Sequence, residues 1–291
     1  MKFIVIVIAM FIERFFPHVQ NLRDLKIFDR YCRAMRIFIG NSKFVDGVVG
    51  IVLVMIPAFL VIGWLQSLLS TGLLVLFGLL FAVLALVASA GPRDMGGLLR
   101  AYLDAIRTGH ESVAVERAED IIGGAVPAVA GERNRAVVHA VLRQINEWLP
   151  AVLFWFAVLG PVGAVLYRLL YALYQQSVRD NEESDFANAV ERIYVLAGWL
   201  PARGVVLAYA LTGSFVDTMQ AWKAAVQSRS TQRYRQSQDA LLVVGLGALG
   251  FGAEAQSYSD QQVKLTLDLL RRVLIVWLVT FALLTLTGFL H

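Results

Sequence analysis

The longest stretch without a charged side chain is the feature that most constrains the fold of this chain. Residues Gly47 to Pro92 contain no Asp, Glu, Lys or Arg, a run of 46 residues. A helix needs roughly 20 apolar residues to cross the hydrocarbon core of a bilayer. The run is too long for one crossing and suits two, with turn residues between 66 and 72. We therefore predict a membrane hairpin with helices near 46–67 and 72–90.

The composition agrees with a membrane protein that also carries some water-facing mass. Of the 291 residues, 58% are hydrophobic and 16% are charged, whereas a soluble domain is about 45–50% apolar and about 25% charged. The same values exclude a disordered chain and a disulfide-built scaffold. Cys32 is the single cysteine, so no internal disulfide can form.

Other apolar segments have the length of a membrane span. Residues 148–167 and 273–291 are free of Asp, Glu, Lys and Arg, and residues 193–216 contain only Arg203. For 193–216 two interpretations stay open, a span with a buried arginine and an interfacial helix. Residues 3–12 are interpreted as a retained membrane helix, because no small-residue cleavage site follows them. The expected number of spans is four to six.

The basic residues indicate which side of the membrane each loop occupies. The net charge is +4, and seven Lys and Arg residues lie in segment 13–46. Cytoplasmic loops are enriched in Lys and Arg, so this segment is expected in the cytoplasm and the 67–71 turn outside. Because the basic residues flank apolar runs, we expect a lipid bilayer as partner and no nucleic acid.

The water-facing segment 93–147 has helical periodicity and no strand pattern. Leu98, Leu99, Tyr102, Leu103 and Ile106 recur at helical spacing, and a second and a third helix follow. The predicted fold class is therefore all-α, a polytopic helical membrane protein with a small helical cytoplasmic domain. Four parts are expected. Residues 1–92 comprise the N-terminal membrane helix, a basic cytoplasmic segment and the hairpin, and residues 93–147 form the cytoplasmic domain. Residues 148–216 comprise a membrane helix and a proline-containing segment, and residues 217–291 comprise a basic cytoplasmic segment and a terminal membrane helix.

Few residues carry recognisable chemistry. Nucleotide-binding loops, nucleophile elbows and zinc pairs are absent from the sequence, so we predict no catalytic and no metal-binding residues. Gly160, Pro161 and Gly163 indicate a structural break, because proline lacks an N–H and glycine allows close backbone approach. Charged and amide side chains at the ends of apolar runs form the candidate ligand-binding set, namely Glu13, Arg14, Asn146, Glu147, Arg168 and Arg203.

Each member of this set also has a purely structural interpretation. Arg168 at a membrane edge can extend its guanidinium to lipid headgroups. Glu147 beside Trp148 can serve as an interfacial anchor, and Glu13 can pair with Arg14.

Several of these segments together resemble a known family. Phe11–Phe16 (FIERFF), Asn146-Glu147, Leu159–Leu169 (LGPVGAVLYRL) and Trp199–Arg203 (WLPAR) stand in the order and spacing of the AmpE family. The resemblance covers residues 1 to about 216 and the terminal membrane helix, and LGPVGAVLYRL is its most specific piece. It implies a multi-pass protein of the bacterial inner membrane, linked to the induction of β-lactamase.

The same landmarks also resemble the wider superfamily that includes the CobD/CbiB adenosylcobinamide-phosphate synthases. That resemblance implies a membrane ligase that uses ATP and magnesium. Two segments depart from it. His139 and Arg143 stand where the synthases have carboxylates, and Tyr194-Val195 stand where they have paired aspartates. Magnesium requires oxygen ligands, so these departures favour the AmpE side and leave the ligase as the alternative.

The resemblance to the AmpE family thus implies an inner-membrane sensor or modulator of β-lactamase induction that responds to cell-wall status. Its six candidate side chains would converge at the cytoplasmic face and bind an anionic small molecule or cell-wall fragment, because arginines suit phosphates and carboxylates. Magnesium and a nucleotide are implied only by the ligase alternative. The sequence leaves the oligomeric state open, and a homodimer is compatible with it.

Overall fold

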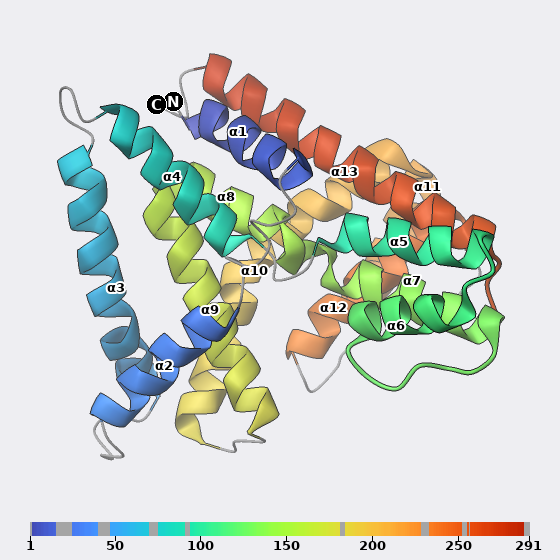
Figure 1. Cartoon of the computed structure of the whole chain (residues 1–291), viewed down its shortest axis with the longest axis horizontal. Helices are drawn as coiled ribbons and strands as arrows, with labels where there is room; N and C mark the ends of the chain where they lie inside the picture. The colour runs from blue at the N-terminus through green and yellow to red at the C-terminus, as the bar shows by residue number, and fades with distance from the viewer. Residues whose placement is uncertain are drawn as a thin grey trace. The chain divides into compact units, whose positions relative to one another are not determined.

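Every regular element in the described part of the chain is an α-helix. The computed structural model describes residues 2–15, 25–39, 47–69, 75–90, 94–180, 184–227, 233–251, 255 and 257–287. Within these ranges no strand occurs, so the prediction of an all-α fold is confirmed (Figure 1). The chain divides into two compact units. Unit 1 consists of Met1–Pro92, Ala151–Gly198 and Phe281–His291, and unit 2 consists of Arg93–Pro150 and Trp199–Thr280.

Unit 1 is built around one long helix. Helix α9 (Pro161–Arg179) packs against α2 (Leu25–Ile39), α3 (Val48–Leu69) and α4 (Val75–Ser89). Helix α1 (Lys2–Phe15) packs on α4, and Lys2 Nζ donates a 3.0 Å hydrogen bond to the carbonyl of Ala157 in α8 (Pro150–Leu159). The charge-free run forms the expected hairpin, since α3 and α4 contact each other (Figure 1).

The outer surface of α3 is apolar. Its buried residues are Gly50, Ile51 and Val54, whereas Leu60 is 59% exposed and Trp64 is 67% exposed. Large apolar side chains exposed along one element indicate a lipid or protein environment rather than water. Because α3 is long enough to cross a bilayer and has no charge, lipid is its natural solvent.

Three of the described helices are long and apolar enough to cross a membrane. They are α3, α10 (Asp185–Thr212) and α13 (Asp260–Leu286), and α10 and α13 contribute residues to both units. The described part of α4 and residues 238–249 form shorter apolar helices. These helices associate the chain with a membrane. The total of four to six spans and the sidedness of the loops stay predictions.

Unit 2 contains the helical segment 93–147 and the partners that it packs against. Helix α5 (Met95–Arg107) packs on α6 (Glu111–Ile122), and α7 (Ala130–Trp148) packs on α6 and on α12 (Arg233–Leu249). Helix α11 (Phe215–Gln227) packs on α12. Helix α6 stops at Gly123, whose φ of 71° is the left-handed conformation that glycine adopts at helix ends. The division of the chain into four functional parts stays a prediction.

The apolar run 148–167 forms two helices rather than one. Helix α7 ends at Trp148, α8 begins at Pro150, and α9 begins at Pro161. Each proline stands at the first position of a helix, where its missing N–H removes no intrahelical hydrogen bond. The uncharged run is therefore interrupted at Gly160 and Pro161, where the sequence indicates a structural break, and also after Trp148.

Candidate functional site

Helix α7 is the element that gathers most of the polar side chains inside unit 2. Its apolar residues Val137, Val138, Val141 and Leu142 are each at most 1% exposed. Because α6 and α12 both pack on α7, more than one of its faces is buried. Polar residues on those faces are therefore buried as well, and burial is costly unless each polar group finds a hydrogen-bond partner.

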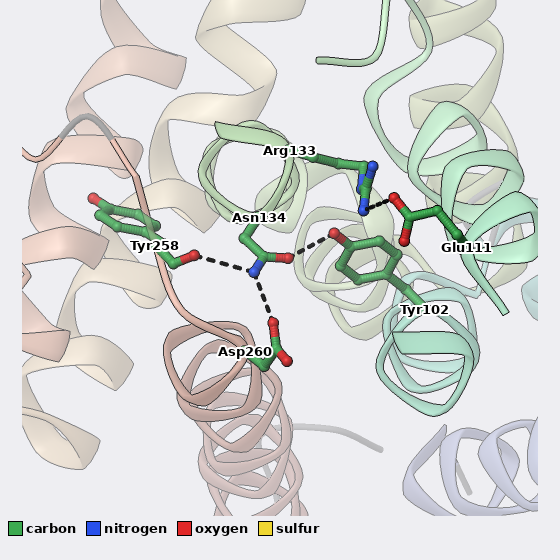
Figure 2. A network of polar contacts seen from close by, with 6 residues as sticks. All are labelled: Tyr102, Glu111, Arg133, Asn134, Tyr258 and Asp260. Carbon is green, nitrogen blue, oxygen red and sulfur yellow. Dashed lines mark hydrogen bonds and ion pairs between the residues drawn. The ribbon is translucent and has the colours of Figure 1, made fainter. Parts of the chain in front are cut away.

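Asn134 is the centre of this polar network. Its side chain is 2% exposed and contacts three partners from two other parts of the chain (Figure 2). The hydroxyl of Tyr102 in α5 donates a 2.6 Å hydrogen bond to Asn134 Oδ1. Asn134 Nδ2 donates to the carbonyl of Tyr258 at 3.1 Å and to Asp260 Oδ1 at 2.9 Å. The amide thereby joins α5, α7 and the first residue of α13.

Two further observations support this junction. The backbone N–H of Tyr258 donates to the carbonyl of Gly131 at 2.9 Å, which fixes the segment before α13 against the start of α7. Burial raises the pKa of the Tyr102 phenol, so the hydroxyl keeps its proton and can donate it to Asn134. Buried hydrogen bonds between helices favour one arrangement of those helices.

Arg133 lies beside Asn134 and connects α7 to α6. Its side chain is 2% exposed, and Nη2 lies 2.6 Å from Oε1 of Glu111, whose side chain is 66% exposed (Figure 2). The pair is thus buried at one end and solvated at the other. Because the Glu111 side chain is largely exposed, its charge contributes little to the pair, and an amide oxygen at position 111 could still accept the hydrogen bond from Nη2.

His139 lies one turn beyond this network on α7. Its ring packs edge-on against Tyr258, with 5.9 Å between ring centroids. Burial, helped by the nearby charges of Arg135 and Arg143, lowers the pKa of His139 to about 4. The imidazole is therefore neutral at pH 7. Arg143 itself forms a 3.0 Å salt bridge from Nε to Asp239 of α12.

The predicted site residues Asn146 and Glu147 lie at the end of α7, in unit 2. They are 7% and 8% exposed, and Gln238 of α12 donates a 2.9 Å hydrogen bond from Nε2 to Oε1 of Glu147. Arg203 of α10 also belongs to unit 2, where its guanidinium lies 3.3 Å from the ring centroid of Trp199 and 5.9 Å from that of Trp222. Such contacts stabilise a cation through the ring faces.

The other three members of the predicted set are Arg168, Glu13 and Arg14. Arg168 is a residue of α9 in unit 1, is 1% exposed and lies 4.8 Å from the ring centroid of Tyr171. The side chains of Glu13 and Arg14 lie outside the described residues. The convergence of all six side chains into one pocket therefore stays a prediction.

The glycines of the 160–163 segment occupy positions where a side chain would not fit. Gly160 stands between α8 and α9 with φ 71° and ψ −154°, a conformation that other residues rarely adopt. A Cβ on Gly163 would be forced onto the backbone carbonyl of Trp155. The turn at Gly160 and Pro161 thus brings α9 directly against the backbone of α8.

The described side chains offer no ready site for a divalent metal. Among them, no group of three or more His, Cys, Asp or Glu residues is arranged to bind a metal ion. Cys32 is fully buried against α9, its Sγ lies 3.9 Å from the carbonyl of Leu169, and burial raises its thiol pKa to about 12. This thiol is neither a ready ligand nor a nucleophile.

Comparison with known proteins settles the family. The model of the family described as "Regulatory signalling modulator protein AmpE" matches residues 1–291 of this chain. The chain belongs to the AmpE family. The resemblance expected from FIERFF, LGPVGAVLYRL and WLPAR is thereby confirmed.

The AmpE-family chain is also similar to curated cobalamin biosynthesis proteins. It is 34% identical over 117 residues to "Cobalamin biosynthesis protein CobD" of Chromobacterium violaceum, covering 40% of this chain and 36% of the relative. It is 32% identical over 117 residues to the protein of the same name from Stutzerimonas stutzeri, covering 40% and 37%. The match thus spans little more than a third of these relatives. No solved structure matches this chain significantly.

Sequence reasoning missed the network around Asn134. The available signal was the periodicity of α7 itself, because Arg133 and Asn134 stand four positions before Val137 and Val138, which are both fully buried. Residues four apart share a helix face. Extending the apolar face backwards by one turn would have placed both polar residues inside the unit.

Proposed function

We propose that this AmpE-family chain is a non-catalytic modulator in the bacterial inner membrane, and that it adjusts β-lactamase induction to the state of the cell wall. The observation that carries the proposal is the Asn134 network. It connects Asp260, the first residue of the candidate span α13, to helices α5 and α7 of the helical unit. A displacement of α13 in the membrane would therefore change the packing of a water-facing helix pair, which is the kind of coupling that signalling needs.

Deletion of the gene tests the physiological part of this proposal. We expect a changed level of β-lactam-induced β-lactamase and a changed amount of cell-wall fragments inside the cell, both restored by the wild-type gene. Unchanged values of both quantities in the deletion strain would contradict the proposal.

A conservative variant tests the coupling itself. Asp260→Asn keeps the shape of the side chain and weakens the charge-assisted bond from Asn134 Nδ2. The matched control is Asp268→Asn on the same helix, whose carboxylate pairs only locally with Arg271 at 3.5 Å. At equal membrane abundance we expect Asp260→Asn to alter the induction response and Asp268→Asn to leave it unchanged. Equal responses from both variants would argue against coupling through the network.

The ligand part of the proposal is an anion bound at the cytoplasmic face by the six predicted residues, with a nucleotide or a phosphorylated cell-wall fragment as the chemical class. Buried Arg168 and stacked Arg203 support it, because a cation held in a partly apolar environment favours a negative ligand. Binding of ATP and of a phosphorylated muropeptide to the purified chain is the test. Arg203→Gln should weaken binding while Arg192→Gln, an exposed arginine on the same helix, should not.

The CobD relatives support a second candidate, a membrane ligase that uses ATP and magnesium. The described side chains do not fit that chemistry. At the positions where the synthases have carboxylates, His139 packs on Tyr258 and Arg143 pairs with Asp239, and Glu147 has an amide neighbour in Gln238. Magnesium needs several oxygen ligands. Rescue of a strain that lacks the synthase would establish the ligase in place of the modulator.

A further inference from the structure

Helix α2 has one face fastened to unit 1 and another face turned outward. On the inner face, Arg179 Nη2 of α9 donates to Asp29 Oδ2 at 2.7 Å and Gln176 Nε2 donates to the Asp29 carbonyl at 2.9 Å. Cys32 is fully buried, and the Arg36 guanidinium lies 4.7 Å from the ring centroid of Phe186. These contacts fix the rotation of α2 about its own axis.

The outer face of α2 combines apolar and cationic side chains. Ile27 is 57% exposed, Ile37 82% and Phe38 85%, and the side chains of Arg30 and Arg33 are exposed as well. At 100° per residue, these five side chains and Ala34 fall within one continuous arc of the helix. Arg30, Ile37 and Arg33 lie in one half of this arc, and Ile27, Ala34 and Phe38 lie in the other half. An exposed helix face that combines large apolar and basic side chains is typical of a helix that lies in a membrane interface.

The contact between α2 and α3 gives the depth at which this face lies. The Tyr31 hydroxyl donates a 2.9 Å hydrogen bond to the carbonyl of Val54. Val54 is six residues beyond Val48, the start of α3, which corresponds to about 9 Å along the helix axis at 1.5 Å per residue. Helix α3 has 22 residues and so spans about 33 Å, close to the thickness of a bilayer core. Helix α2 therefore lies near one end of a candidate span.

We infer that α2 is an interfacial helix that binds an anionic phospholipid surface, with Ile27, Ile37 and Phe38 inserted among the acyl chains and Arg30 and Arg33 at the phosphates. Two observations support lipid as the occupant. Helix α2 packs against α3, whose outer surface is apolar, and the exposed charges of α2 are cationic, which complements anionic headgroups. Asp29, the acidic residue of α2, is turned away from this face and is 4% exposed.

The depth of α2 can be measured on the full chain in nanodiscs that contain phosphatidylcholine and phosphatidylglycerol. A nitroxide is attached at Ala34→Cys, and buried Cys32 supplies little background labelling. We expect the label to be accessible to oxygen and shielded from a water-soluble nickel chelate. A label at Asp104→Cys, an exposed position on α5, is the control and should be accessible to the chelate.

Two results would overturn this assignment. Equal access of the chelate to positions 34 and 104 would place α2 in water. Shielding of position 34 from both oxygen and the chelate would indicate a protein occupant, such as a second copy of the chain. If the Ala34 label disturbs folding, a label at Phe38→Cys provides the same measurement.

The proposed preference of α2 for anionic phospholipids is tested by analysing the lipids that co-purify with the chain. The double variant Arg30→Gln/Arg33→Gln should reduce the enrichment of phosphatidylglycerol over phosphatidylcholine about tenfold or more, as two basic residues near a membrane surface are lost. The matched control is Arg107→Gln/Arg192→Gln, two exposed arginines that belong to other helices than α2. Equal enrichment in both double variants would exclude anionic headgroups as ligands of Arg30 and Arg33.

Discussion

Helix α3 of unit 1 and helix α7 of unit 2 have opposite relations to their surroundings. The charge-free α3 turns large apolar residues such as Leu60 and Trp64 outward, and only 17% of its most apolar window is buried. Helix α7 instead turns Arg133, Asn134 and Glu147 inward. The difference teaches that α3 is adapted to a lipid surrounding, whereas α7 is adapted to burial among the other helices of its unit.

The two units also hold their helices together by different means. In unit 1, the turn at Gly160 lets α9 approach the α8 backbone so closely that residue 163 has no room for a Cβ. In unit 2, side-chain hydrogen bonds from Asn134 join three segments. Substitutions in each unit can therefore test whether packing or polar pairing dominates there.

The largest effect is expected for Asn134→Leu. The leucine cannot bond the Tyr102 hydroxyl or the Tyr258 carbonyl, and leaving such buried groups unsatisfied should lower the free energy of unfolding by about 3 kcal/mol. The measurement is unfolding of the purified chain in mixed micelles. The exposed Asn188→Leu is the control and should change stability by less than about 0.5 kcal/mol. Equal losses would show that unit 2 does not depend on this network.

Gly163→Ala should produce the next largest effect. Its methyl group would meet the carbonyl of Trp155, so α8 and α9 must separate, which should cost about 2 kcal/mol. Gly124→Ala is the matched control, because no atom lies within 4 Å of a Cβ built there. If Gly163→Ala is as stable as Gly124→Ala, close backbone packing is not what holds unit 1 together.

The apolar pattern alone predicted the hairpin, because a charge-free run of 46 residues has few structural solutions. Helices α5 and α6 were predictable from their apolar spacing and from Gly109 and Gly123, which have positive φ. The Asn134–Asp260 bond was not predictable, since it joins residues 126 positions apart. Local periodicity carries no information on which distant segment covers a helix face.

The candidate site also shows that a local sequence pattern does not identify the distant neighbours of a residue. Sequence reasoning selected charges at the ends of apolar runs, and Glu147 and Arg168 are indeed buried. It could not assign their neighbours, such as Gln238 for Glu147 and Tyr171 for Arg168. Those neighbours depend on how α12 packs on α7 and on the rotation of α9, which are tertiary properties.

His139 should make unit 2 sensitive to acid. Its pKa is lowered to about 4 in the folded chain from an ordinary 6.5, so the unfolded chain binds more protons between these values and stability falls as pH decreases from 6.5 to 4. Allowing for partial solvation, we expect a loss of about 1 kcal/mol by pH 5. His139→Gln should abolish this loss and the exposed His110→Gln should keep it. Identical pH profiles in all three proteins would contradict the burial of a neutral imidazole.

The smallest effect is expected for Glu111→Gln. Because the glutamate side chain is 66% exposed, loss of its charge should cost only about 0.5 kcal/mol, and less at high salt. Arg133→Met at the buried end should cost more than Glu111→Gln. The reverse order would show that the exposed end of the pair dominates. Unfolding at low and high ionic strength provides the measurement.

Cysteine accessibility tests the contrast between the lipid-facing and water-facing helices most directly. Leu60→Cys on α3 and Glu119→Cys on α6 place thiols at exposed positions, and a membrane-impermeant maleimide is applied to spheroplasts and to inside-out vesicles. We predict labelling of position 119 in inside-out vesicles only, and of position 60 in neither preparation. Labelling of position 60 to the level of position 119, or labelling of position 119 in spheroplasts, would contradict the account.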